Sequence, residues 1–347
     1  MKDRLVLGID TSCDDTSVAV LRGRSVLSSV VSSQLDIHAQ YGGVVPDIAR
    51  REHEKNMPLV IDEALNKARV KIEDIEYIAV TYGPGLAIDL EVGITFAKEL
   101  SKRYNIPLIP VNHMEGHLLS SLLLNSKGRG MVEDMDDIFP ALGLLMSGKH
   151  TEIIRVDGIG KYEKIGQTLD DAAGEAFDKV GRMLNFGYPG GPVVSEFAKR
   201  GKRGNITFTV PMKHSNDLNF SFSGIKTAAL YKSKELIESG VPQREWVYDF
   251  CRGFVDAVYE SIAIKLSKAI ELNHDVKCVL VGGGVFNSEE VLRRLSSLVK
   301  SYSLDFYYPD MEFRGDNGAM VALVGVLNID SVCKDIDSLD RDPRLSL

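Results

Sequence analysis

Short apolar runs divided by tight polar turns begin the chain. Residues 4–10 read RLVLGID, residues 16–23 read TSVAVLRG and residues 25–34 read SVLSSVVSSQ. Runs of this length, bounded by Gly and Asp, predict three β-strands in an antiparallel meander. The same pattern returns further along the chain, in ALGLLMS (141–147), TEIIRVDG (151–158) and KYEKIGQT (161–168).

After each meander the apolar spacing changes to that of helices alternating with strands. The first meander is followed by expected helices at 49–68 and 91–104 and by the strands YIAVTYGPG (77–85) and PLIPVN (107–112). The second is followed by the helical stretch DDAAGEAFDKVGRML (170–184), the Gly- and Pro-rich segment NFGYPGGP (185–192), a helix at 246–272, the strand VKCVLVGGG (276–284), another helix and the strand LDFYYP (304–309).

This repetition predicts an α/β fold of two duplicated lobes with a ligand cleft between them. The length of 347 residues also exceeds what one hydrophobic core commonly serves. The polar, Gly-containing stretch around residues 126–138 is typical of a linker. We therefore expect an N-terminal lobe at 1–130 and a C-terminal lobe at 131–347, whose last segment is able to pack back on the N-terminal lobe.

Composition and charge narrow the class of protein. The chain is 44% hydrophobic and 26% charged, and its four cysteines form no CxxC pair, so neither a zinc ribbon nor a disulfide framework is indicated. No signal-peptide core and no run of roughly 20 apolar residues occurs, and we expect a cytoplasmic protein without membrane contact. The net charge of −8 argues against unaided nucleic-acid binding. KRGKRG, at 199–204, is the densest basic stretch, either a local docking patch or a solvated loop.

Glycine-bearing turns follow four of the expected strands, at residues 8–15, 81–85, 146–150 and 281–287. Glycine after a strand lets backbone N–H groups approach an anion closely, so four such turns in two lobes favour a nucleotide site. GLLMSGKH (143–150) resembles a P-loop, but His150 stands where the magnesium-binding hydroxyl is needed. No GxGxxG follows a strand, so a Rossmann dinucleotide site is not indicated.

The stretch VNHMEGHLLS (111–120) contains the strongest candidate chemistry. In a helix over 112–125, His113 and His117 lie on one face and could chelate one transition-metal ion, with a third ligand from a distant part of the chain. Alternatively they are polar residues of a surface helix. Glu115 does not follow the first histidine directly, as the HExxH peptidase pattern requires, and would point about 200° away from it.

Ten segments in a fixed order give this chain a specific resemblance, over about residues 5–326. They are GIDTSCDDTSVAV, YGGVVPDIARREH, GPGL, HMEGH, SGKHT, DDAAGEAFDKVGRML, GYPGGP, FSFSGIKTA, GGGVFN and DNGAM. With them the chain resembles the universal TsaD-type tRNA threonylcarbamoyltransferases, formerly described as O-sialoglycoprotein endopeptidases. The resemblance implies duplicated actin-like ATPase (ASKHA) lobes. It implies transfer of the threonylcarbamoyl group of threonylcarbamoyl-AMP to adenosine 37 of tRNAs reading codons that begin with A, with release of AMP.

The resemblance also implies the site residues. One divalent metal ion, iron or zinc, would be held by His113, His117 and Asp316, side chains from both halves of the sequence. The adenylate pocket would comprise Leu145, Met146, Ser147, Gly148, Lys149, Asp178, Gly191 and Asn287.

Each implied residue has a chemical role to fill. Two imidazoles and one carboxylate leave metal positions open for substrate. Asp178 could accept hydrogen bonds from ribose hydroxyls or from the threonyl part, or be a solvated helix residue. Asn287 could bond the nucleotide or cap a helix. No side chain is an obvious covalent nucleophile, and Cys13 is a candidate on chemistry alone. We expect direct attack by the adenosine amine, helped by proximity.

Departures from the family pattern refine the resemblance. Lys149 replaces the second glycine of the bacterial SGGHT, and it either contacts phosphate or obstructs the loop. Leu145 stands where the archaeal and eukaryotic cytosolic branch has a tyrosine ligand, so the bacterial and organellar branch fits better. The expected partners are tRNA, threonylcarbamoyl-AMP and, unless the chain is organellar and self-sufficient, TsaB- and TsaE-like proteins. The alternatives are a non-catalytic nucleotide-binding subunit of a tRNA-modification assembly, or a metallopeptidase.

Overall fold

The computed structural model describes residues 3–135 and 137–347. Contacts divide the chain into two compact units. Unit 1 comprises Met1–Asp137, Gly158–Tyr162 and Tyr307–Leu347, and unit 2 comprises Ile138–Asp157 and Glu163–Phe306. The division at Asp137 falls within the predicted linker, of which residue 136 lies outside the described residues. Arg24 donates hydrogen bonds to the carbonyl groups of Val132 and Glu133, which attaches this part of the linker to unit 1.

The sheet of unit 1 contains the predicted meander. Its strands are β1 (Leu5–Asp10), β2 (Asp15–Arg22), β3 (Ser25–Ser33), β4 (Tyr77–Gly83) and β5 (Leu108–Asn112). They lie in the order β3-β2-β1-β4-β5. The pairs β3–β2 and β2–β1 are antiparallel, and the pairs β1–β4 and β4–β5 are parallel. Because parallel strands end at the same edge, the carboxyl ends of β1, β4 and β5 lie together there.

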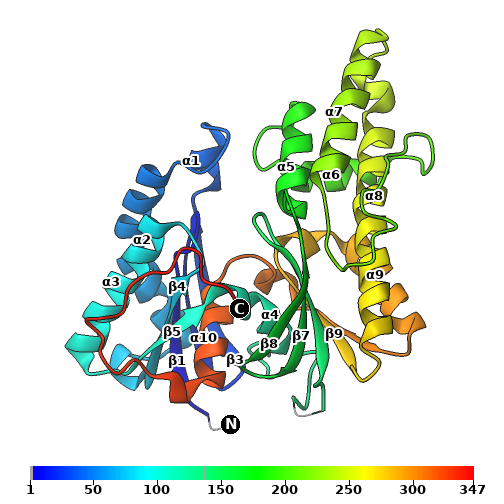
Figure 1. Cartoon of the computed structure of the whole chain (residues 1–347). Helices are drawn as coiled ribbons and strands as arrows, with labels where there is room; N and C mark the ends of the chain where they lie inside the picture. The colour runs from blue at the N-terminus through cyan, green and yellow to red at the C-terminus, as the bar shows by residue number, and fades with distance from the viewer. Residues whose placement is uncertain (1–2, 136) are drawn as a thin grey trace. The chain divides into compact units, whose positions relative to one another are not determined.

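Helices cover this sheet, with α2 and α3 seen beside it in Figure 1. They are α1 (Leu35–Ala39), α2 (Pro46–Ala68), α3 (Ala87–Tyr104), α4 (His113–Leu119) and α10 (Gly318–Leu327). Alternate residues of β1 face opposite sides of the sheet. Leu7 and Ile9 join the buried cluster that includes Met57 of α2, whereas Gly8, between them, lies against α10.

The apolar helix α10, which the sequence pattern did not predict, places the C-terminal segment in unit 1. It reads GAMVALVGVL and is buried from Gly318 to Val326. It packs against β1, β2 and β4. The sequence-based division placed 131–347 in the second lobe and left room for its last segment to pack on the first. Tyr307–Leu347 has its contacts in unit 1, because an all-apolar helix is stable only where every face is covered.

Unit 2 repeats the sheet of unit 1. Its strands are β6 (Ala141–Met146), β7 (Thr151–Gly158), β8 (Lys161–Gln167), β9 (Cys278–Gly282) and β10 (Asp305–Tyr307). Their order is β10-β9-β6-β7-β8. The first strand of each meander therefore pairs antiparallel with the second and parallel with a later strand, β4 in one sheet and β9 in the other. The predicted duplication is confirmed.

Five helices belong to unit 2: α5 (Ala173–Met183), α6 (Gly191–Ala198), α7 (Ser223–Glu238), α8 (Gln243–Leu272) and α9 (Glu289–Ser301). The sequence pattern predicted α5, α8 and α9 but not α6, which begins inside the Gly- and Pro-rich segment with Pro192 in its first turn. Proline is tolerated there because the first N–H groups of a helix have no intrahelical partner. Among the described residues, no helix is both long enough and apolar enough to cross a membrane.

Candidate metal centre and substrate pocket

The two histidines lie on α4, a short helix that starts directly after β5. The side-chain oxygen of Asn112 caps this helix by accepting hydrogen bonds from the backbone N–H groups of Met114 (2.9 Å) and Glu115 (3.4 Å). The helix ends at Leu119, and a 3₁₀ turn at 120–122 follows, so it is shorter than the predicted 112–125. The cap starts the helix at the sheet edge where β1, β4 and β5 end.

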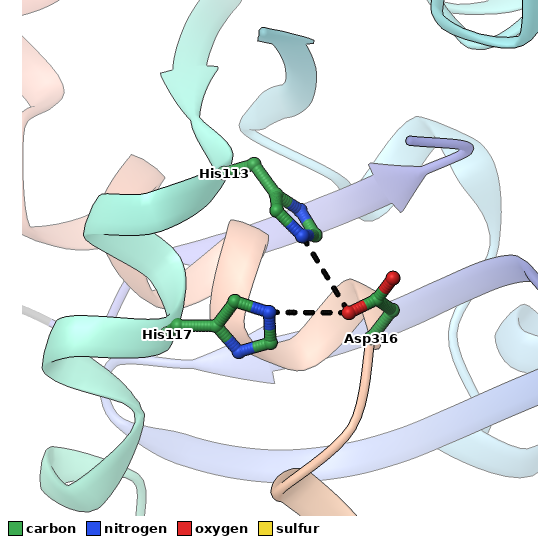
Figure 2. Close-up of side chains that lie close together, drawn as sticks. All are labelled: His113, His117 and Asp316. Carbon is green, nitrogen blue, oxygen red and sulfur yellow. Dashed lines mark hydrogen bonds and ion pairs between the residues drawn. The ribbon is translucent and has the colours of Figure 1, made fainter. Parts of the chain in front are cut away.

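His113, His117 and Asp316 come together in unit 1, as Figure 2 shows. Oδ1 of Asp316 lies 3.1 Å from Nε2 of His117 and 3.5 Å from Nε2 of His113. His113 is 8% exposed and His117 1%, so the alternative of polar residues on a surface helix is wrong. Two imidazole nitrogens and one carboxylate oxygen, all within 4.8 Å of one another, are a donor set that suits zinc or iron and leaves positions open.

The expectation that both halves of the protein contribute to this group needs a correction. Asp316 is distant from the histidines in sequence, but it immediately precedes Asn317, the N-cap residue of α10. Since α10 packs in unit 1, all three side chains belong to that unit.

The charges of the group depend on one another. Burial alone raises the pKa of the Asp316 carboxyl, but His113 and His117 hold it well below its usual range. Burial likewise lowers the pKa of His113, yet the carboxylates of Asp10 and Asp316 outweigh it and raise this pKa to about 10. The buried carboxylate of Asp10 and the half-buried carboxylate of Asp316 therefore favour positive charge beside them, which a divalent cation supplies.

Asp10 is a residue of this centre to which the sequence reasoning assigned no role. Its Oδ1 lies 3.3 Å from Nδ1 of His113, and it is fully buried at the end of β1. Its Oδ2 accepts a hydrogen bond from Ser12, whose hydroxyl also lies 3.5 Å from Nε2 of His113. A carboxylate behind a histidine orients the ring and makes it a stronger ligand. The sequence did contain a signal for this role of Asp10: a carboxylate at the end of a predicted strand that runs parallel to β4 and β5.

Glu115 faces away from the group, as its spacing predicted. Its Oε1 accepts hydrogen bonds from the Tyr162 hydroxyl (2.7 Å) and from Nδ2 of Asn328 (2.9 Å). Burial raises the pKa of Glu115 and that of Tyr162. A carboxylate held in this way does not supply the general base of a peptidase.

In unit 2, the end of β6 and the turn after it carry five of the predicted pocket residues. Leu145 and Met146 are buried at the end of the strand, and Gly148 and Lys149 are exposed. The Ser147 hydroxyl accepts hydrogen bonds from the backbone N–H groups of Lys149 (3.3 Å) and His150 (3.1 Å). These two hydrogen bonds close the turn around the Ser147 side chain, with Lys149 on its exposed side.

The start of α5 lies directly against this turn. The N–H of Gly174 donates to the Ser147 carbonyl (3.2 Å), and a Cβ at Gly174 would lie 2.6 Å from that oxygen. Gly283, after β9, has a φ of +106° and equally little room beside the Met146 carbonyl. Only glycine fits at both positions, so the turns after β6 and β9 and the start of α5 lie against one another.

Asp178 and Gly191 also meet. Oδ1 of Asp178 accepts a hydrogen bond of 2.9 Å from the N–H of Gly191 at the start of α6. Asp178 is therefore a structured acceptor and not merely a solvated helix residue. Asn287 is exposed at the end of the 3₁₀ turn 284–287, and this turn packs against β6 and α5.

The turn at 81–85 does not have the expected anion-binding role. Gly85 N–H donates to the Pro343 carbonyl, and Leu86 N–H donates to the Ser12 carbonyl. A Cβ at Gly83 would lie 1.9 Å from the Asp342 carbonyl oxygen. The C-terminal segment thus occupies this turn, and its backbone N–H groups are engaged within the chain.

Solved structures with the same fold define the class of protein. The chain is similar to (R)-2-hydroxyglutaryl-CoA dehydratase component A of Acidaminococcus fermentans, with a TM-score of 0.52, 14% identity and coverage of 92% of this chain and 96% of that one. It is also similar to HypF of T. kodakarensis, with a TM-score of 0.60 and 16% identity. That match covers 95% of this chain and 48% of HypF. These likenesses concern the fold alone and identify a two-lobed α/β protein of the actin-like ASKHA class.

Sequence comparison then gives the family. The family model described as TsaD: tRNA N6-adenosine threonylcarbamoyltransferase matches residues 25–323. A relative bearing that name in Trichlorobacter lovleyi is 42% identical over 337 residues, which cover 97% of this chain and 95% of the relative. Another, in Thermosipho africanus, is 43% identical over 321 residues, which cover 92% of this chain and 93% of the relative. The chain belongs to the TsaD family of tRNA N6-adenosine threonylcarbamoyltransferases, and the predicted family is confirmed.

Proposed function

We propose that this chain transfers the threonylcarbamoyl group of threonylcarbamoyl-AMP to the exocyclic amine of adenosine 37, in tRNAs that read codons beginning with A. Family membership carries the reaction class, a tRNA-modifying acyl transfer. The observation that supports the chemistry best is the group of two buried imidazoles and one half-buried carboxylate in unit 1.

In this proposal one divalent ion, iron or zinc, is held by Nε2 of His113, Nε2 of His117 and Oδ1 of Asp316. When bound, it supplies positive charge that polarises an acyl carbonyl or neutralises phosphate. Asp10, whose Oδ1 lies near Nδ1 of His113, would orient the ring, and Ser12 would hold the Asp10 carboxylate through its hydrogen bond. The geometry supports this assignment because the three ligand atoms converge while the other side of each ring faces the protein.

The chain's other predicted residues hold the adenylate in the proposal. The turn of Ser147, Gly148 and Lys149 offers backbone groups and one cation to the phosphate, while the Asp178–Gly191 pair and Asn287 offer acceptors and donors to the nucleoside or threonyl part. The adenosine N6 attacks the carbamoyl carbonyl carbon, and a C–N bond forms between them. The bond from that carbon to the phosphate oxygen breaks to release AMP, and one N6 proton is lost to solvent. Positioning of both reactants supplies the rate gain, and no covalent enzyme intermediate is needed.

The two alternatives are less well supported. A metallopeptidase needs a base beside the metal, and Glu115 is engaged with Tyr162 and Asn328 instead. A non-catalytic nucleotide-binding subunit does not account for a buried His-His-Asp group. It would bind adenylate without ever producing modified tRNA.

The reaction itself is the first test. Incubation of this chain with threonylcarbamoyl-AMP, tRNA and purified TsaB- and TsaE-like proteins should yield tRNA whose digested nucleosides include threonylcarbamoyladenosine by mass spectrometry. Reactions without the partners determine whether the chain is self-sufficient, as an organellar member would be. Tight adenylate binding with no modified nucleoside under any condition would favour the non-catalytic alternative.

The basic segment 199–204 gives a prediction about tRNA. Lys199 and Lys202 are exposed. Lys199 pairs with Glu196 at 2.5 Å within one exposed helix turn, a kind of ion pair that contributes little. Arg203 pairs with Glu290, which is only 17% exposed. The two lysines can therefore exchange their surroundings for a phosphate more easily than Arg203 can. Replacing both with glutamine should raise the KM for tRNA several-fold. The slope of the logarithm of the binding constant against the logarithm of the salt concentration should also become shallower, by about 0.7–0.9 for each lost phosphate contact.

The matched control for this prediction is the replacement of Lys55 and Lys67, two exposed lysines of α2, with glutamine. An unchanged salt slope in the Lys199 and Lys202 variant, or an equal change in the control, would show that the segment does not contact tRNA.

A further inference from the structure

The buried carboxylate of Glu115 lies between the two histidines in sequence but takes no part in their group. Because an α-helix turns about 100° per residue, Glu115 projects from the side of α4 opposite to His113 and His117. Both hydrogen-bond donors it binds, Tyr162 and Asn328, belong to unit 1. The helix is therefore held on two opposite sides by polar side chains.

Helix α10 gives this arrangement a rigid base. Gly318, its first residue, donates from its N–H to the Ser17 hydroxyl (2.8 Å), and Gly8 of β1 is so close that a Cβ there would lie 2.2 Å from the Gly318 carbonyl oxygen. Further along, a Cβ at Gly325 would lie 2.6 Å from that of Ala79. Such backbone proximity leaves α10 little freedom to move over the sheet.

Helix α4 meets α10 along its length. Asp316, just before α10, faces His117. In the middle of α10, Met320 packs on Gly116, and its Cγ lies 3.1 Å from the place that a Cβ on Gly116 would occupy. Asn328, just after α10, donates a hydrogen bond of 2.9 Å to Glu115. With only seven residues, α4 has too few internal hydrogen bonds to keep its own orientation. Its rotation about its axis therefore depends on these side-chain contacts.

We propose that Glu115, through Asn328 and Tyr162, is a positioning residue that sets the rotation of α4 and so holds the His113 and His117 nitrogens at the spacing the metal requires before the metal binds. This inference rests on the proposed metal role of the histidines. Rotation of α4 moves both Nε2 atoms relative to Asp316, because both rings project from the same face. The Glu115 contacts oppose that rotation from the other face, which lowers the ordering cost of metal binding.

Cobalt(II) is the probe for the test, because its visible absorption reports both binding and ligand geometry. In the full-length protein, Glu115→Ala and Asn328→Ala should each weaken Co²⁺ affinity about 10- to 100-fold, the range for partners behind metal ligands, and alter the absorption bands. Glu115→Gln retains a carbonyl oxygen that can accept from both donors and should bind within about threefold of wild type. The Glu115→Ala/Asn328→Ala double variant should be no weaker than Glu115→Ala, because the two act through one contact.

A structural control separates positioning from general destabilisation. Ser28→Ala removes a buried hydrogen bond of 2.7 Å to the Ala64 carbonyl of α2; it should lower stability and leave Co²⁺ binding unchanged. Tyr162→Phe removes one donor and tests the same idea if Glu115→Ala does not fold.

Wild-type affinity and spectrum in Asn328→Ala and Tyr162→Phe, or equal loss in Glu115→Gln and Glu115→Ala, would overturn the positioning role. Failure of the wild-type protein to bind Co²⁺ would instead overturn the metal site itself.

Discussion

Replacing His117 with alanine is expected to remove the bound metal and the transferase activity together. His117 is 1% exposed, and its Nε2 is 3.1 Å from Oδ1 of Asp316. The variant therefore loses one of three proposed protein ligands and leaves the Asp316 carboxylate with less positive charge nearby. Metal affinity should fall at least about 1000-fold, or about 4 kcal/mol. The rate of transfer should fall at least about 100-fold, as when a charge-stabilising group is removed.

Metal content by elemental analysis and nucleoside mass spectrometry measure the two effects on one sample. His38→Ala is the matched control, because His38 is another fully buried histidine of unit 1, hydrogen-bonded to Gln34 (3.0 Å) and outside the metal group. That control should lose stability and keep its metal. A His117→Ala protein that transfers threonylcarbamoyl normally without metal would remove the proposed role of the centre.

Gly8→Ala should destabilise unit 1 strongly. A Cβ at Gly8 would lie 2.2 Å from the Gly318 carbonyl oxygen and 2.5 Å from the Ala322 nitrogen, and both are backbone atoms that no side-chain rotation can move away. Strand β1 and helix α10 must then separate, at a cost of roughly 3 kcal/mol or more. In thermal unfolding the midpoint should fall by about 6–12 °C, taking about 2–4 °C per kcal/mol for a unit of this size.

The same substitution should weaken metal binding, because α10 starts directly after Asp316. Gly158→Ala is the control: a Cβ there meets nothing within 4 Å, and its backbone is not left-handed. That variant should melt within about 1 °C of wild type, well inside the range of ordinary surface substitutions. A Gly8→Ala protein as stable as this control would contradict the close packing of β1 on α10.

The sequence by itself predicted the strands of both sheets and named the three side chains that are proposed to hold the metal. Alternating apolar positions and glycine turns are local signals, so the two meanders and the strands after them could be predicted before any contact was known. The histidine spacing on α4 is equally local. Asp316 was different, because no local pattern joins residue 316 to residue 113, and it was assigned only through the resemblance to a family.

Only the tertiary structure decided where α10 packs, and several features depend on that packing. An apolar helix carries no periodic signal that tells which sheet will cover it, so the sequence did not show that Asp316 enters unit 1 or that Asn328 reaches Glu115. The roles of Asp10 behind His113 and of Pro343 on the 81–85 turn are contacts between segments distant in the chain. Such contacts result from the whole fold, because they form only when separate elements are packed against each other.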